Sequence, residues 1–179
     1  TGLTNGDGGY YTCDRWKWVE FGAPSFVFTQ TQSTDVPTGQ GFANSLKLDC
    51  TTAQGSFASA DGLRIDQRVE GQNLQMLKKG TSSAEAVTIS FWVKSNKTGT
   101  YIFELFDQDN LRAISTAYTI SSSDTWEKKV IPIPADTIGL FDNNNARSLD
   151  INWWLGAGTD YTSGTLQTSW ATQIGANRA

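Results

Sequence analysis

The sequence predicts an all-β protein built as a β-sandwich, and its composition and two neighbouring segments carry this prediction. Aromatic residues make up 12% of the 179 residues and 17 glycines accompany them, which is typical of β-structure with many turns. In segment 87–93, Val87, Ile89 and Phe91 alternate with polar residues, the period of a strand with one buried face. Segment 101–105 alternates in the same way, and turn formers at 95–99 join the two. This indicates a hairpin whose apolar faces need a second layer to cover them.

Seven further segments have strand-like patterns, which brings the expected number of strands to about nine. They are 10–18, 26–28, 45–52, 63–69, 114–120, 126–134 and 149–155. One segment differs: Leu74 and Leu77 lie three apart, two lysines follow, and Gly80 closes the pattern, which predicts one short helix. From about residue 157 the pattern is irregular. Residues 1–179 are expected to form a single β-sandwich domain.

Charge and composition exclude several classes of function. The formal net charge is −4 and no basic cluster stands out, so nucleic acid is not an expected partner. No run of about 18 apolar residues occurs, so no membrane partner or membrane span is expected. The chain has no histidine, which removes the usual general base and a common transition-metal ligand. The opening residues lack the basic and apolar regions of a signal peptide.

The sequence does not decide whether its two cysteines, Cys13 and Cys50, form a disulfide. Cys50 continues the alternation of Leu46 and Leu48, which favours a buried free thiol that packs as a small hydrophobe.

Several motifs occur in a fixed order and carry a resemblance. They are NGD at 5–7 with YTCDRW at 11–16, STDVP at 33–37, LRIDQRVEG at 63–71, VTISFWVKSNKT at 87–98 and DTWEKKVIPIP at 124–134. Together they resemble a family of virion structural proteins of tailed phages, common in marine phages, with a carbohydrate-binding-module-like jelly roll. The resemblance spans most of residues 4–157. It implies a jelly-roll β-sandwich of the galactose-binding-like kind, a place on the virion surface, and other virion proteins as partners.

The chain departs from that family at two points. Cys13 and Cys50 stand where the family usually has apolar residues, which fits a buried thiol. The family usually ends with a further strand of the type ITGVQLEVG, which this sequence lacks. We therefore expect either a truncated form or an open sheet edge that a neighbouring copy completes.

A sugar-binding face is the first candidate for function. Apolar faces of sugar rings stack on aromatic rings, while amides, carboxylates and cations bind the hydroxyl groups. Side chains of this kind are expected opposite to buried strand positions, and the predicted carbohydrate-binding residues are Trp92, Asp150, Asn152, Trp154 and Arg64. The alternative is that these tryptophans belong to a second core.

Metal binding and catalysis are weaker candidates. Asn and Asp clusters at 5–7, 107–110 and 142–145 offer oxygen ligands of the kind calcium takes, but none has the full spacing of an EF-hand loop. Turn formation accounts for them, so no metal ligands or cofactor are predicted, and structural calcium is kept as the alternative. The glutamates are scattered, and no Ser-His-Asp set or phosphate-binding glycine loop occurs. No catalytic residues are predicted, and the chain is expected not to be an enzyme.

The expected function is that of a non-enzymatic phage virion surface protein, a head (capsid) decoration or a tail appendage such as a tail fibre, which attaches weakly to glycans. Weak single sites suffice when many copies are displayed on one particle. The alternative is a purely structural decoration or cementing protein that binds neighbouring virion proteins and no sugar. The glycan, the position on the virion and the oligomeric state are left open.

Overall fold

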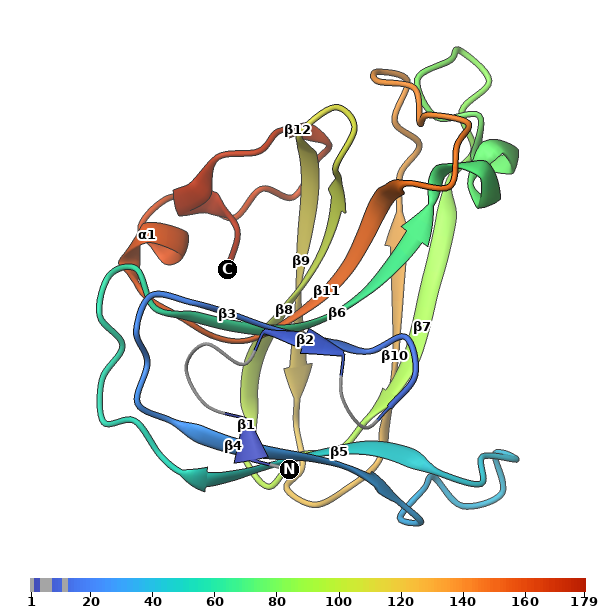
Figure 1. Ribbon diagram of the computed structural model, residues 1–179. Coiled ribbons are helices and arrows are strands. Elements are labelled where there is room, and N and C mark those ends of the chain that lie inside the picture. Colours follow the sequence, from blue (N-terminus) through green and yellow to red (C-terminus); the bar gives the residue numbers. More distant parts are fainter. Residues whose placement is uncertain (1, 4–7, 11–12) are drawn as a thin grey trace.

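The computed structural model describes residues 2–3, 8–10 and 13–179, and these residues form three antiparallel sheets (Figure 1). The largest sheet has seven strands, in the order β12 (Ala171–Thr172), β9 (Arg112–Ile120), β8 (Gly99–Asp107), β11 (Arg147–Ala157), β6 (Gly62–Glu70), β3 (Lys17–Phe21) and β2 (Gly9–Tyr10). A two-stranded sheet pairs β7 (Val87–Val93) with β10 (Glu127–Ile133). A three-stranded sheet contains β1 (Gly2–Leu3), β4 (Val27–Ser33) and β5 (Ser45–Thr52). The prediction of an all-β protein is confirmed.

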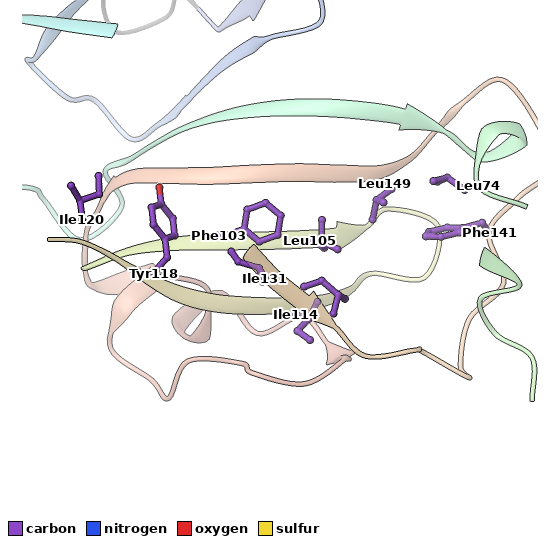
Figure 2. Close-up of a cluster of buried hydrophobic side chains, with 10 residues drawn as sticks. Leu74, Phe103, Leu105, Ile114, Tyr118, Ile120, Ile131, Phe141 and Leu149 are labelled. Carbon is purple, nitrogen blue, oxygen red and sulfur yellow. The ribbon is translucent and has the colours of Figure 1, made fainter. Parts of the chain in front are cut away.

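Each small sheet packs on the large sheet over its own apolar cluster. The cluster under β7 and β10 includes Phe103, Ile114 and Ile131 (Figure 2). The cluster under β4 and β5 is built around Trp18, which is fully buried. Trp153 of β11 packs against both clusters and joins them. Burial of these faces is what the alternating apolar pattern of the strands predicts.

The predicted hairpin between segments 87–93 and 101–105 is wrong. β7 pairs with β10, whereas β8 pairs with β9 and β11. The turn at 95–98 instead carries the chain from one layer to the other, and the stacked rings of Phe91 and Phe103 lie 6.1 Å apart across the core. Alternation shows that each strand has a buried face, but it does not distinguish two strands that pair from two that face each other.

The predicted helix around residues 74–80 consists of two 3-10 turns, η1 (Gly71–Asn73) and η2 (Gln75–Leu77). The α-helix found among the described residues is α1 (Thr159–Thr162), in a C-terminal segment that also holds β12 and η3 (Gly175–Asn177). Much of that segment lies outside regular helices and strands. None of the helices among the described residues is long and apolar enough to cross a membrane.

Both cysteines are free thiols, but the predicted burial of Cys50 is wrong because its side chain is exposed. Leu46 and Leu48 pack against the Trp18 cluster and are only partly buried. Near Cys50 the pairing of β5 with β4 shifts register between Val27 and Phe28.

The edge of β9 is paired within the chain over part of its length. Ala171 and Thr172 of β12 pair with Ala113 and Arg112, and the Ser115 N–H donates to the carbonyl of Gln167 at 2.7 Å. These contacts cover this part of the edge of β9, and the open edge or completion by a neighbouring copy stays a prediction.

Candidate functional site

The face of the seven-stranded sheet that points away from both apolar clusters carries a continuous row of mostly polar side chains. The strand register aligns its members across six neighbouring strands, in the order Tyr10, Lys17, Asp66, Asn152, Glu104 and Ser115. We call this set the polar row and the surface that carries it the polar face. The alternation of side chains along each strand explains this position. Ile65, Trp153 and Phe103 are chain neighbours of members of the polar row, so they point to the opposite face and pack in the apolar clusters.

One end of the polar row is covered by the C-terminal segment. Figure 1 shows this segment, in red, on the opposite side of β3 and β6 from β4 and β5. The guanidinium of Arg178 donates to both carboxylate oxygens of Glu104, at 2.7 and 2.8 Å. Glu104 also accepts hydrogen bonds from Asn152 Nδ2 at 2.9 Å and Trp154 Nε1 at 3.2 Å. Glu104 is fully buried, so these donors solvate its carboxylate where water molecules would do so at the surface.

Trp154 lies at this covered end and is only 3% exposed. The guanidinium carbons of Arg178 and Arg64 lie 5.2 and 5.4 Å from the centre of its ring. The rings of Phe21 and Tyr161 pack around it at 6.0 and 5.4 Å. Burial lowers the pKa of Arg64 to about 10, and the nearby charge of Arg178 adds to this effect. The ring of Trp154 is therefore part of a second core of cations and aromatic rings.

The other end of the polar face holds three partly exposed cations above two buried carboxylates. Arg147 donates two hydrogen bonds to Asp150, and Arg68 Nη2 lies 3.4 Å from Asp66 Oδ2. Lys17 neighbours Asp66 in the register. Burial raises the pKa of Asp66. Burial first, and then the charge of Arg68, lowers the pKa of Lys17.

The ring of Tyr10 is 54% exposed and lies next to Lys17 on the neighbouring strand. We call Tyr10, Lys17, Arg68 and Arg147 the cationic end. It combines an accessible aromatic ring with side chains that donate hydrogen bonds.

Some buried polar atoms of this face have no hydrogen-bond partner in the described part of the chain. They are Arg64 Nε and Nη1, Arg68 Nε, Asp66 Oδ1 and Asn152 Oδ1. A buried polar atom without a partner costs about 1–3 kcal/mol, and such atoms in a native structure call for an explanation. The polar face thus retains donors and acceptors that its own side chains do not use.

The predicted carbohydrate-binding residues divide between two places. Arg64, Asp150, Asn152 and Trp154 all lie on the polar face, and Trp154 is the register partner of Arg64. Trp92 lies on β7 of the small sheet, opposite Lys128 in the register, and does not join them. Trp154 is not the open platform that the sequence predicts. Sugar binding by these residues stays a prediction.

The sequence reasoning missed Tyr10, Lys17 and Arg147 as members of a site. Lys17 lies between Trp16 and Trp18 in an alternating segment, which is a signal for an outward position. Its place beside Asp66, however, depends on the pairing of β3 with β6.

A second buried ionic cluster attaches the loop after β10 to the rest of the fold. Lys79 Nζ lies 2.5 Å from Asp107 Oδ2 and 3.1 Å from Asp136 Oδ2. Arg112 donates to both oxygens of Asp136, at 2.8 and 2.9 Å. Lys79 also donates to the carbonyl of Gly139. The cluster satisfies its own charges, which suits a structural role.

The Asn and Asp clusters at 107–110 and 142–145 form turns. Asp107 Oδ1 accepts the backbone N–H groups of Asp109 and Asn110, and Asp109 Oδ2 accepts that of Asp142. Across 2–3, 8–10 and 13–179, no group of three or more Cys, Asp or Glu residues is placed to hold a metal ion. The cluster at 5–7 lies outside the described residues, and structural calcium stays untested.

Replacing Asp136 by asparagine should lower the free energy of unfolding by about 2 kcal/mol at pH 7, because Arg112 and Lys79 lose their buried carboxylate. Burial opposes ionisation of Asp136, but hydrogen bonds from Arg112 and Lys79 outweigh it and lower the pKa below the ordinary 3.8. The carboxylate therefore stabilises the fold above about pH 4, and this stability is lost as the pH falls through the folded pKa. Urea unfolding from pH 7 to pH 2 should show the difference between wild type and Asp136→Asn shrinking below pH 4. A difference that is constant over this range would contradict the assignment.

Comparison with known proteins gives one structural likeness. No protein-family model matches the chain, and the search of curated proteins found no match. A similar solved structure is the enzymatically active domain of tailspike protein 4 of bacteriophage CBA120, with 18% sequence identity and a TM-score of 0.47. The likeness covers 78% of this chain and 17% of that one.

One prediction is corrected by this comparison. The sequence predicts that the chain is not an enzyme, whereas the similar structure is described as an enzymatically active domain. That prediction is withdrawn. A likeness of this degree assigns no reaction and no catalytic residue to this chain.

Proposed function

We propose that this chain is a phage virion surface protein, a head decoration or tail appendage, which attaches weakly to glycans through the cationic end of the polar face. The ordered sequence motifs support the virion assignment. The carbohydrate-binding-module-like character that they imply supports the choice of glycans as ligands. Weak attachment is sufficient on a particle that displays many copies, because the sites then act together.

The observation that carries the proposal is the exposed ring of Tyr10 beside partly exposed cations. A sugar ring has an apolar face that packs on an aromatic ring, and hydroxyl groups that both donate and accept hydrogen bonds. Lys17 and the partly exposed guanidinium of Arg68 are donors on the same face as that ring.

The test is retention of the purified protein on a panel of immobilised neutral and acidic polysaccharides. Tyr10→Ala should weaken retention by about tenfold or more, because stacking on an accessible aromatic ring is lost. Its melting temperature should stay within a few degrees of wild type, since the ring is mostly exposed. Trp92→Ala is the matched control on the other layer of the sandwich and should retain binding.

Two outcomes would contradict the proposal. Retention that is lost in Trp92→Ala and kept in Tyr10→Ala would place the site on the outer face of β7 and β10. Failure of the wild-type protein to bind any member of the panel would remove glycan attachment altogether.

A second candidate function, a structural protein that binds neighbouring virion proteins and no sugar, is favoured by an apolar patch. Leu111, Ile138, Leu140 and Ile174 are each more than half exposed. Their segments contact one another, because Asn110 Nδ2 donates to the Leu140 carbonyl and the Gln173 N–H donates to the Leu111 carbonyl. Exposed apolar patches often mark protein interfaces. Self-association in light scattering that is abolished by Leu140→Ser, together with no glycan retention, would favour this candidate.

A further inference from the structure

We infer that the glycans bound at the cationic end are acidic: a negatively charged group on the sugar, a carboxylate or a sulfate ester, binds between Lys17 and Arg68 while the sugar ring packs on Tyr10. This inference rests on the proposed function and specifies its ligand class.

The first step of the argument is the charge exposed at this end. Lys17, Arg68 and Arg147 are partly exposed, whereas Asp66 and Asp150 beneath them are fully buried. The chain as a whole carries a net charge of −4, so three partly exposed cations from three neighbouring strands on one sheet face are a local exception. A further acid at the rim, Glu70, is the register partner of Arg147.

Among the described residues, the carboxylate of Glu70 forms no ion pair within 4 Å with Lys17, Arg68 or Arg147. Its Oε2 accepts hydrogen bonds from Gln72 Nε2 at 2.7 Å and from Asn73 Nδ2 at 3.4 Å. Arg147 is instead held by its two hydrogen bonds to Asp150. Arg147 therefore contributes charge, and its bonding capacity is largely used.

The second step is that Lys17 and the exposed part of Arg68 retain bonding capacity for a ligand. Lys17 makes no ion pair within 4 Å with any residue of the described ranges. Within those ranges the partly exposed guanidinium of Arg68 makes only long contacts with carboxylates, from Nη2 to Asp66 Oδ2 at 3.4 Å and from Nε to Asp150 Oδ1 at 3.9 Å. The pKa of Lys17 is lowered by burial and then by the charge of Arg68, with Asp66 opposing less strongly. An anion at this place would relieve the repulsion between the two cations and accept charge-assisted hydrogen bonds from both.

The third step is the neighbouring aromatic ring. Tyr10 lies beside Lys17 in the register, so a cation and an accessible ring are presented by adjacent strands. A free inorganic anion would use the cations alone. A sugar that carries an anionic group would use the cations and the ring together, and this combination selects an acidic glycan.

The test compares retention on polygalacturonate, sulfated dextran and neutral dextran. The wild-type protein should bind an acidic polysaccharide at least about tenfold more tightly than neutral dextran, and added salt should weaken the binding by screening the exposed charges. Lys17→Gln should remove most of this preference without changing the melting temperature by more than a few degrees. Lys128→Gln, an exposed lysine on β10, is the matched control for net charge and should behave as wild type. Tighter binding of one of the two acidic polymers identifies the carboxylate or the sulfate as the preferred group.

Each other outcome overturns the inference in a recognisable way. Equal binding of neutral and acidic polymers that still requires Tyr10 would refute the preference for acid and leave the proposed function intact. Equal weakening by Lys17→Gln and Lys128→Gln would show unspecific attraction of a polyanion and would also refute it. Failure to bind all three polymers, together with the wider neutral and acidic panel, would refute the proposed function and this inference with it.

Discussion

Replacing Trp154 by alanine should lower the free energy of unfolding by about 3–5 kcal/mol, the cost of removing a large buried aromatic side chain. The side chain is 3% exposed and contacts the rings of Phe21 and Tyr161. Its indole N–H also donates to the buried carboxylate of Glu104, which would lose a donor. Such a loss is a large share of the stability of an ordinary domain. Urea unfolding followed by circular dichroism measures it.

The matched control is Trp92→Ala, which removes the same side chain from the outer face of β7. Trp92 is only partly buried, so we expect a loss of about 1 kcal/mol, the usual size for a substitution away from the core. Similar small losses for both variants would mean that Trp154 is an accessible surface ring, as the sequence predicts, and would contradict the second core described here.

Replacing Glu104 by glutamine should cost about 3–5 kcal/mol as well, because it removes the carboxylate from a buried ionic network. Arg178 donates two hydrogen bonds to it, and Arg64 Nη1 lies 3.8 Å from Glu104 Oε2. Without this carboxylate, buried Arg64 and partly buried Arg178, which both lie close to the ring of Trp154, lose the negative charge between them. The C-terminal segment should pack less stably on the sheet, and amide hydrogen exchange over 159–179 should then become faster.

A double-mutant cycle with Arg178→Met separates the ion pair from other effects of the substitution. Because the two side chains contact each other, the double variant should be less destabilised than the sum of the single variants, by at least about 1 kcal/mol. Additive losses would show that Glu104 and Arg178 act independently, which the two short hydrogen bonds do not allow.

Alternation in the sequence predicts which residues share a strand face, and it succeeds where the cover is another regular strand. Ile89 and Phe91 on β7, and Phe103 and Leu105 on β8, face the core as predicted. It does not predict which strands pair, and so it predicts a hairpin where the chain crosses from β7 to β8 in the other layer. Pairing is decided by long-range packing, which the local period does not contain.

The burial of Trp154 could not be predicted for a related reason. Its cover comes from Tyr161 and Arg178, in a segment whose sequence has no regular period. The short 3-10 turns before Lys79 were taken for a helix on their leucine spacing. The ion pairs of Lys79 with Asp107 and Asp136 fix this end of the segment, and they too are long-range.

The candidate site was predictable in part. The alternation of Arg64, Asp66 and Arg68 places them on one face of their strand, and the same period places Asp150 and Asn152 on the neighbouring one. Tyr10 and Lys17 join them only through the register of β2, β3 and β6. No local pattern in residues 9–18 indicates that these strands lie beside β6.

Binding-induced changes in the nuclear magnetic resonance spectrum of the isotope-labelled protein would test the central claim most directly. The protein would be titrated with oligosaccharides of the polymer that retains it best. The account predicts that the largest amide shifts lie at Tyr10, Lys17, Arg68 and Arg147, while segment 87–94 around Trp92 stays unchanged. Shifts concentrated at Trp92 or at the apolar patch of Leu111, Ile138, Leu140 and Ile174, or no shifts with any oligosaccharide, would contradict it.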